Sequence, residues 1–505
     1  MLARVLALPL ILLLTGIAGL SMFVPAIHGA LGGEFHVARS FFYAGTLTLI
    51  LVALIGIATA GRPPERDPQR QLLSLFGAFL LLPLVMAVPF HEAVRSTSFL
   101  NAYVEMVSSL TTTGATVFAE PERLSPVLHL WRAQVAWLGG LLMWVAAAAI
   151  MAPMNLGGFE VTASAEPGQG QGRLAQLANA APPRRILRAA ARLAPVYGGL
   201  TLALWVTLLI AGETPLVGLV HAMSILSTSG ISAVGGTEQA GAGPAGEAVM
   251  VLFLLFALTR LTFSTDTMTT ARRGLRHDPE FRLALAIATG VPLILFLRHW
   301  VGAYEVDEVE NLAAALRAFW GSVFTVVSFL TTTGFVSADW AAAQAWSGLE
   351  TPGLILMGLA IIGGGVATTA GGVKLLRVYA LYLNGMREIE RLVHPSSVGR
   401  ATVMSRRLRR RGAFVAWIFF MLFALILALV IVIFAALGSD FEQATVLAVA
   451  ALSTTGPLIA VAAEQPIALG SLPEAARLVF CAAMILGRLE MLAIIALLSP
   501  SLWRR

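Results

Sequence analysis

Charged residues are scarce in this sequence of 505 residues. Aspartate, glutamate, lysine and arginine together make up 12% of the chain, whereas 57% of the residues are hydrophobic. A soluble globule of this size could not present enough polar surface to water with such a composition. Apolar runs long enough to cross a hydrocarbon core of roughly 30 Å recur along the whole length, and the intervals between them are too short for a separate soluble domain. The sequence therefore predicts an all-α integral membrane protein.

Cysteine and lysine are almost absent as well. The single cysteine, Cys481, lies in an apolar stretch, so neither an intramolecular disulfide nor a cysteine-based metal site is available. The single lysine is Lys374. Positive charge is therefore carried by arginine and is spread over several connections, a pattern that membrane topology explains without nucleic-acid binding. We expect no nucleic-acid partner.

The positions of the basic residues predict the orientation in the membrane. Of the 34 lysine and arginine residues, 24 fall in the segments 62–71, 163–195, 271–283, 374–411 and the C-terminus. These segments are alternate connections, and such a bias marks the cytoplasmic face, so both termini are expected inside. The first span, at about 4–27, is longer than the apolar core of a signal peptide and precedes a second span, so we expect a retained helix.

An internal fourfold repeat is the main pattern in the sequence. Four elements rich in threonine and serine end in Gly114, Gly230, Gly334 and Gly456, which are separated by 116, 104 and 122 residues. Each element follows a short apolar segment and lies between two long apolar spans. The predicted fold is four helix/half-helix/helix repeats around a pseudo-fourfold axis plus two N-terminal transmembrane helices, or ten membrane segments and four half-helices. The predicted units are residues 1–61 (the N-terminal pair), 72–160, 193–270, 281–390 and 412–505.

The segments before the loops, such as 99–110 and 441–452, are too short to cross a bilayer and must enter and return. Non-helical backbone at membrane depth persists only where it is buried in protein or lines water, so four such loops on one axis would line a pore. A dehydrating cation needs oxygen ligands, which backbone carbonyls supply. Glycine permits positive φ and a close approach of four backbones. The C-terminal dipole ends of the half-helices would favour cations over anions.

One such element alone would more simply be a helix end with a glycine cap, but four copies in register favour a cation filter. The predicted filter residues are Thr112, Thr113, Gly114 and Ala115; Thr228, Ser229, Gly230 and Ile231; Thr332, Thr333, Gly334 and Phe335; and Thr454, Thr455, Gly456 and Pro457. The acidic residues Glu305, Asp307, Glu308 and Glu310 either concentrate cations at the mouth or form an ordinary solvated loop.

On these loops the chain resembles the TrkH/KtrB/HKT superfamily of potassium transporters, over roughly residues 70 to 500. The N-terminal pair of spans is similar to the TrkH branch. The resemblance implies potassium uptake across the bacterial inner membrane, with potassium as the permeant ligand and no other cofactor. Glycine at all four filter positions matches the potassium-selective members. It also implies a homodimer and a cytoplasmic regulatory ring of nucleotide-binding RCK domains, similar to TrkA.

A glycine-rich stretch resembles the broken second helix of the third repeat, which implies an intramembrane gating loop. Five glycines within ten residues should break a helix, and threonine can satisfy the freed backbone groups. A close-packed glycine face is the alternative. The expected gate residues are Gly363, Gly364, Gly365, Thr368, Thr369, Gly371, Gly372 and Lys374.

Residues 487–490 resemble a family motif that carries an arginine near the pore axis, which adds Arg488 to the expected gate. An arginine at this depth should face protein or water. Its alternatives are an ion pair with Glu490 or a side chain that reaches the inner interface. Arg260 departs from the family pattern. It either pairs with Asp266 or faces an inner vestibule, and its role stays open.

Other functions are weakly supported. Residues 241–246 match a dinucleotide-binding pattern, but no strand precedes them and a membrane span follows, so we expect no nucleotide site there. Nucleotide control would then come from a partner protein. Its expected contact surfaces are Arg406–Arg411 and the loop at 163–195. These basic segments are equally well explained by topology. An intramembrane enzyme has only His221, beside Ser224 and Ser227, as a candidate, and helix packing explains it better. An ion-coupled symporter of potassium or sodium is the alternative function, although such carriers usually show paired inverted repeats.

Overall fold

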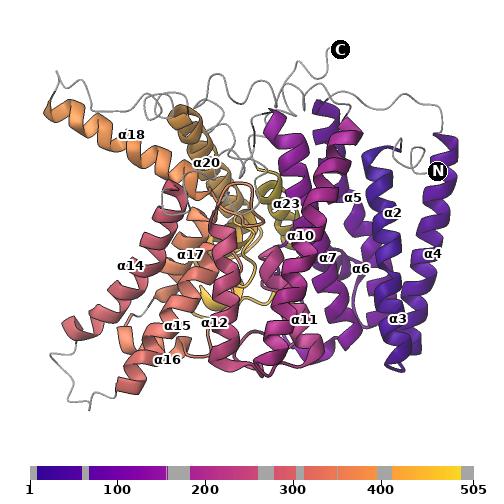
Figure 1. The fold of residues 1–505 in the computed structure, drawn as a ribbon, viewed down its shortest axis with the longest axis horizontal. Coiled ribbons are helices and arrows are strands. Elements are labelled where there is room, and N and C mark those ends of the chain that lie inside the picture. The colour runs from indigo at the N-terminus through magenta and orange to yellow at the C-terminus, as the bar shows by residue number, and fades with distance from the viewer. Residues whose placement is uncertain are drawn as a thin grey trace.

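The computed structural model describes residues 8–59, 68–154, 156, 182–259, 278–302, 312–349, 351–394 and 412–490. All regular structure within these ranges is helical, which confirms the all-α prediction. Eight of the described helices are long and apolar enough to cross a membrane. The chain therefore has the architecture of a multi-pass membrane protein (Figure 1).

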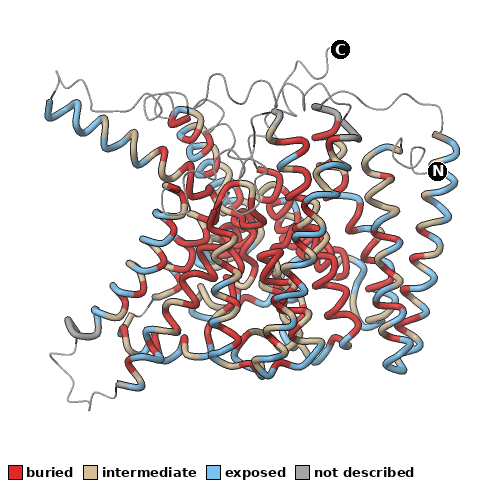
Figure 2. The backbone as a smooth tube through the Cα atoms, in the orientation of Figure 1, coloured by how far each residue is buried: buried red, intermediate tan, exposed pale blue. Residues whose placement is uncertain are grey.

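The N-terminal helices lie together at one edge of the molecule (Figure 1). They are α2 (Leu10–Ser21), α3 (Phe23–Leu31) and α4 (Phe35–Ala58). Helices α2 and α3 form one span that joins at Met22, which is buried. Small residues let this span approach α4 closely, because a β-carbon on Gly45 would lie 3.0 Å from the Gly19 carbonyl oxygen. The outer face of α4 is exposed and apolar, as expected of a helix that faces lipid (Figure 2).

The remaining helices follow one order four times along the chain. A helix is followed by a second helix that leads into one of the Ser/Thr-Gly elements, and a further helix comes next. The first two groups are α5 (Pro68–Val94), α6 (Phe99–Leu110) and α7 (Pro126–Ala146), then α10 (Pro182–Ile210), α11 (Pro215–Ser227) and α12 (Gly243–Leu254). The last two are α14 (Pro279–Gly302), α15 (Leu312–Leu330), α16 (Trp340–Ser347), α17 (Pro352–Ile362) and α18 (Leu375–Val393), then α20 (Ala413–Ala436), α21 (Phe441–Leu452), α22 (Leu458–Val461) and α23 (Glu474–Leu489).

Polar caps begin two of the helices that lead into loops. The Ser98 side chain accepts a hydrogen bond from the Asn101 amide at the start of α6. Asp440 does the same for the Gln443 amide at the start of α21. Such caps satisfy donors that the first helical turn leaves unpaired, so both short helices have defined beginnings.

The third such helix differs from the expectation of a half-helix. Helix α15 has 19 residues, whereas α6 and α21 have 12 each. At about 1.5 Å per residue it is long enough to be counted among the eight potential spans. It nevertheless ends at Leu330, at the position in its loop that Leu110 and Leu452 occupy in theirs. The additional length is therefore at its N-terminal end.

Burial is concentrated around the four loops. Figure 2 shows the buried backbone gathered in the middle of the molecule, whereas α18 and the outer faces of α4 and α14 are largely exposed. Helix α18 extends obliquely away from the body (Figure 1). The core thus surrounds irregular backbone at the centre of the helices, where lipid could not satisfy its polar groups.

Candidate permeation site

All four loops begin with a threonine in the left-handed backbone region. The φ angles are 54° at Thr112, 52° at Thr228, 58° at Thr332 and 54° at Thr454. This conformation is unusual for a β-branched residue and costs about 1–3 kcal/mol when the surroundings impose it. Sequence reasoning assigned positive φ to the glycines alone and missed these threonines. The same strain in four loops indicates that one backbone geometry is required in all of them.

A hydrogen-bond pattern repeats with this geometry. In each loop the amide after the strained threonine donates to the carbonyl five residues earlier in the helix, as Thr113 does to Ser108 at 2.8 Å. The other three bonds are each 2.9 Å, from Ser229 to Ser224, Thr333 to Ser328 and Thr455 to Ala450. Hydroxyl pairs two residues apart tighten each turn, at 2.8 Å for Thr111 with Thr113 and 3.1 Å for Ser227 with Ser229, Thr331 with Thr333 and Ser453 with Thr455. The serine and threonine hydroxyls therefore hold the helix ends in one shape.

The glycines are the points at which neighbouring loops touch. A β-carbon on Gly114 would lie 1.7 Å from the Ser229 carbonyl oxygen, and one on Gly230 would lie 2.1 Å from the Thr333 carbonyl oxygen. One on Gly334 would lie 2.9 Å from Cγ of Pro457. No side chain fits at these positions unless the neighbouring loop moves.

The fourth loop closes the ring onto the first. A β-carbon on Gly456 would lie 2.0 Å from the Ala115 nitrogen, and the Gly456 amide donates to the Thr113 carbonyl at 2.6 Å. Gly114, Gly230 and Gly334 have positive φ, whereas Gly456 does not. Glycine is required at Gly456 for close approach rather than for φ. The four predicted quartets thus meet in cyclic order.

Oxygen atoms that suit a cation are present in this ring. The threonine and serine residues of the quartets are buried. Among the described residues, the hydroxyl oxygens of Thr112 and Thr454 have no hydrogen-bond partner. No group of three or more histidine, cysteine, aspartate or glutamate residues that could hold a metal ion occurs in the described ranges. A cation in the ring would therefore rely on carbonyl and hydroxyl oxygens, which suit a weakly held, dehydrating ion.

The glycine-rich stretch breaks the helix between α17 and α18. Helix α17 ends at Ile362, α18 begins at Leu375, and Gly363 has a φ of 73°. The freed backbone groups find partners within the protein: the Gly365 amide donates to the Ala257 carbonyl at 2.9 Å, and the Thr368 hydroxyl to the Gly365 carbonyl at 2.7 Å. We call residues 363–374 the intramembrane loop.

The intramembrane loop lies directly against the ends of three of the Ser/Thr-Gly loops. The Gly371 amide donates to Oγ1 of the strained Thr332 at 2.7 Å, and the Thr369 hydroxyl donates to the Leu226 carbonyl at 3.1 Å. A β-carbon on Gly371 would lie 2.0 Å from the Ser453 carbonyl oxygen. The loop therefore contacts the second, third and fourth repeats at once.

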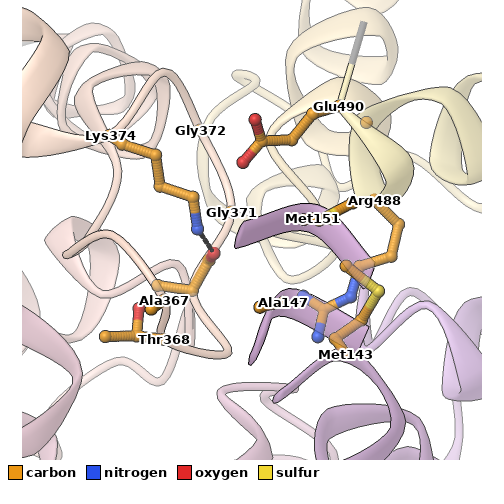
Figure 3. Close-up of a pocket in the computed structure, with 12 residues that line it drawn as sticks. Met143, Ala147, Met151, Ala367, Thr368, Gly371, Gly372, Lys374, Arg488 and Glu490 are labelled. Carbon is orange, nitrogen blue, oxygen red and sulfur yellow. Dashed lines mark hydrogen bonds between the residues drawn. The ribbon is translucent and has the colours of Figure 1, made fainter. Parts of the chain in front are cut away.

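Arg488 meets the same loop from the opposite side. Its Nη1 donates to the Thr369 carbonyl at 2.5 Å, and the side chain is buried. Figure 3 shows Arg488 reaching toward Met143 and Ala147, across from the intramembrane loop. These residues line a cavity of about 30 Å³ together with Thr368, Gly371 and Lys374. The Lys374 ammonium donates to the Ala370 carbonyl within the loop.

The ion pair proposed between Arg488 and Glu490 is not formed. Glu490 pairs with Arg377 instead, with Nη2 and Oε2 2.6 Å apart. Residues two positions apart do not share a helical face, and Glu490 also follows the end of α23 with a φ of 61°, so its side chain is directed away from Arg488. The Arg377 guanidinium also lies 3.8 Å from the centre of the Phe419 ring. Arg377 thus ties the start of α18 to the fourth repeat.

Sequence reasoning missed several buried charges around these loops. Besides Arg377, they include Glu280, whose Oε1 accepts from the Val366 amide at 2.7 Å, Glu247, which accepts from the Ser337 hydroxyl and the Ala338 amide, and the pair formed by Glu105 and Arg132. A charged residue inside an apolar span is the signal that could have found them.

Several predicted features lie outside the described residues. They are Arg260 and Asp266, the acidic group at 305–310, Arg406–Arg411, most of the 163–195 loop and both termini. His221 is described, and its Nε2 lies 2.9 Å from Oγ of Ser232. The arrangement is that of a packing histidine near the second loop.

Comparison with known proteins assigns the family. The family model for TrkH, described as a cation transport protein, matches residues 79–505. The Trk system potassium uptake protein TrkH of Halomonas elongata is 31% identical over 439 residues, which cover 86% of this chain and 84% of that protein. TrkH of Escherichia coli K12 is 29% identical over 457 residues, covering 87% and 88%. The crystal structure of the potassium transporter TrkH from Vibrio parahaemolyticus matches with a TM-score of 0.81 and 27% identity, covering all of both chains. The resemblance seen in the sequence is confirmed, and the chain belongs to the TrkH family of cation transport proteins.

Proposed function

We propose that this protein takes up potassium across the bacterial inner membrane through a filter formed by its four loops. The observation that carries the proposal is the cyclic contact of the loops through Gly114, Gly230, Gly334 and Gly456. Four copies of one strained turn in mutual contact support a ring of equivalent oxygen atoms, and rings of such oxygens replace the water of a dehydrating cation. The relatives named as potassium uptake proteins support potassium as the ion.

The intramembrane loop is proposed as the gate. It packs against the filter through Thr332 and Leu226, and its bonds to these positions are single hydrogen bonds. Such bonds contribute about 0.5–1.5 kcal/mol each, so a modest rearrangement could release the loop. Arg488 adds positive charge beside it and would oppose cation passage while it is bonded to Thr369. Release of the intramembrane loop together with withdrawal of Arg488 would then open the path for cations below the filter.

Regulation and assembly complete the proposal. We expect a TrkA-like ring of RCK domains at the cytoplasmic face, a homodimer, and both termini in the cytoplasm. The boundaries proposed for the four repeats follow those expected from the sequence. Four repeats of one loop geometry favour channel-like passage over an ion-coupled symporter, since such carriers usually show paired inverted repeats.

Growth of a potassium-uptake-deficient bacterium tests the proposed function. Expression of this chain should restore growth at low potassium, because a potassium path is the missing function. The check compares growth across a series of potassium concentrations with an empty vector and with a Gly358→Ser control, whose added side chain has no neighbour within 4 Å. No rescue by well-expressed membrane protein, with and without a co-expressed TrkA-type partner, would contradict the proposal.

A further inference from the structure

The outgoing chain of the first filter loop is held by a buried carboxylate. Oε1 of Glu105 accepts hydrogen bonds from the Thr116 hydroxyl at 2.7 Å and from the Val117 amide at 2.5 Å. Glu105 is fully buried in α6, the helix that leads into the same loop. Thr116 and Val117 follow the filter glycine, Gly114, by two and three residues. Glu105 therefore connects the helix before Gly114 to the extended segment after it.

The charge of this carboxylate is balanced by one arginine. Oε2 of Glu105 lies 2.9 Å from Nε of Arg132, which comes from α7 and is 5% exposed. Hydrogen bonds to an ionised group are about twice as strong as neutral ones. A buried ion pair of this kind contributes little net stability relative to apolar residues of similar size. Its main effect is therefore to fix the positions of the groups that it contacts.

The same register carries a polar connection in three repeats. Glu105 stands nine residues before its filter glycine, and the corresponding residues are His221, Thr325 and Leu447. His221 lies 2.9 Å from the Ser232 hydroxyl, and the Thr325 hydroxyl accepts from the Ser337 amide at 3.2 Å. In each case the partner follows the filter glycine by two or three residues. The same position therefore holds the outgoing segment in three of the four repeats.

The fourth repeat lacks this connection, since Leu447 has no polar group. Its loop is joined to the first loop instead, through the bond from the Gly456 amide to the Thr113 carbonyl. The fourth loop therefore depends on the first for its position, and the connection at Glu105 affects both loops. Of the three connections at this position, the one at Glu105 is a carboxylate paired with a buried arginine, and the outgoing segment of the third loop also bonds to the buried carboxylate of Glu247, through the Ser337 hydroxyl and the Ala338 amide at 2.8 Å each.

We infer that Glu105, oriented by Arg132, is a positioning residue that sets the ion preference of the filter. The inference rests on the proposed function of the four loops. Loss of the connection would let the segment after Gly114 relax and would loosen the oxygen spacing in the first and fourth loops. Preference between potassium and sodium should suffer before the protein loses its fold.

Paired substitutions test this role without leaving a buried charge. Glu105→Gln with Arg132→Gln keeps an acceptor for Thr116 and Val117, whereas Glu105→Leu with Arg132→Leu removes it. We expect the leucine pair to lower the ratio of potassium to sodium flux about tenfold, and the glutamine pair to retain most of it, because the leucine pair removes two hydrogen bonds whose contributions together correspond to roughly a factor of ten. Fluxes are measured in vesicles with matched protein levels.

A milder variant keeps the test decisive if the leucine pair does not fold. Thr116→Val removes one donor to Glu105 and should lower the flux ratio in the same direction by a smaller factor. Thr445→Val is its control, because that hydroxyl bonds only to the Phe441 carbonyl of its own helix. Equal ratios in parent, Thr116→Val and the folded leucine pair would overturn the inference. A parent without potassium preference would instead count against the proposed function.

Discussion

Replacing Arg488 with alanine should increase cation flux by about two decades and leave the preference for potassium unchanged. The guanidinium is positively charged at neutral pH and lies beside the intramembrane loop, bonded to the Thr369 carbonyl. At an effective dielectric constant near 20, two unit charges about 6 Å apart repel by roughly 3 kcal/mol, which corresponds to about two decades in rate. Since the filter oxygens belong to other residues, their selectivity should persist.

Rubidium and potassium uptake into vesicles with matched protein levels measures this effect. Arg488→Lys should keep most of the barrier because it retains the charge. Arg391→Ala is a suitable control, since Arg391 is exposed on α18 and pairs only with nearby Glu388 among the described residues. Flux from Arg488→Ala at or below that of the parent would remove Arg488 from the path and leave it as a structural link to Thr369.

Serine in place of Gly114 should abolish most of the discrimination between potassium and sodium. The added β-carbon would lie 1.7 Å from the Ser229 carbonyl oxygen, a separation that no side chain can occupy. The φ of 75° at Gly114 adds about 1–3 kcal/mol of strain for any other residue. The second loop must therefore move, and the spacing of the oxygen ring moves with it. We expect the flux ratio to fall at least tenfold.

Gly334→Ser provides a graded comparison. Its β-carbon would meet the Pro457 ring at 2.9 Å rather than a backbone carbonyl, so a smaller adjustment suffices and the loss of discrimination should be smaller. Gly358→Ser, with open space around it, should behave as the parent does. An unchanged potassium-to-sodium ratio in both filter variants, at normal expression, would rule out the filter assignment.

Local patterns in the sequence were sufficient to predict the main elements of this fold. The apolar spans and the break at residues 363–374 could be predicted because both depend on local sequence. A span is recognised by the length of its apolar run, and glycines destabilise the helix in which they lie. The helices end at Leu110, Leu330 and Leu452, next to the predicted Ser/Thr-Gly elements. The 19-residue length of α15 was not anticipated, since the segments before all four loops were expected to be too short to cross a bilayer.

Long-range pairings were beyond such reasoning. Arg377 and Glu490 are 113 residues apart in sequence, and their ion pair depends on how α18 and α23 pack. Proximity in sequence suggested Arg488 as the partner of Glu490, but the turn at the end of α23 separates them. The positive φ of Thr112 and its counterparts is likewise imposed by the surrounding loops against the local preference of threonine.

The central claim is that the ring of four loops passes potassium in preference to sodium. Flux of both ions through the purified, unaltered chain in lipid vesicles, with no proton or sodium gradient, tests it most directly. The account predicts potassium flux down its own gradient that exceeds sodium flux under identical conditions. Equal fluxes of the two ions, or potassium movement only when a proton or sodium gradient is imposed, would contradict it.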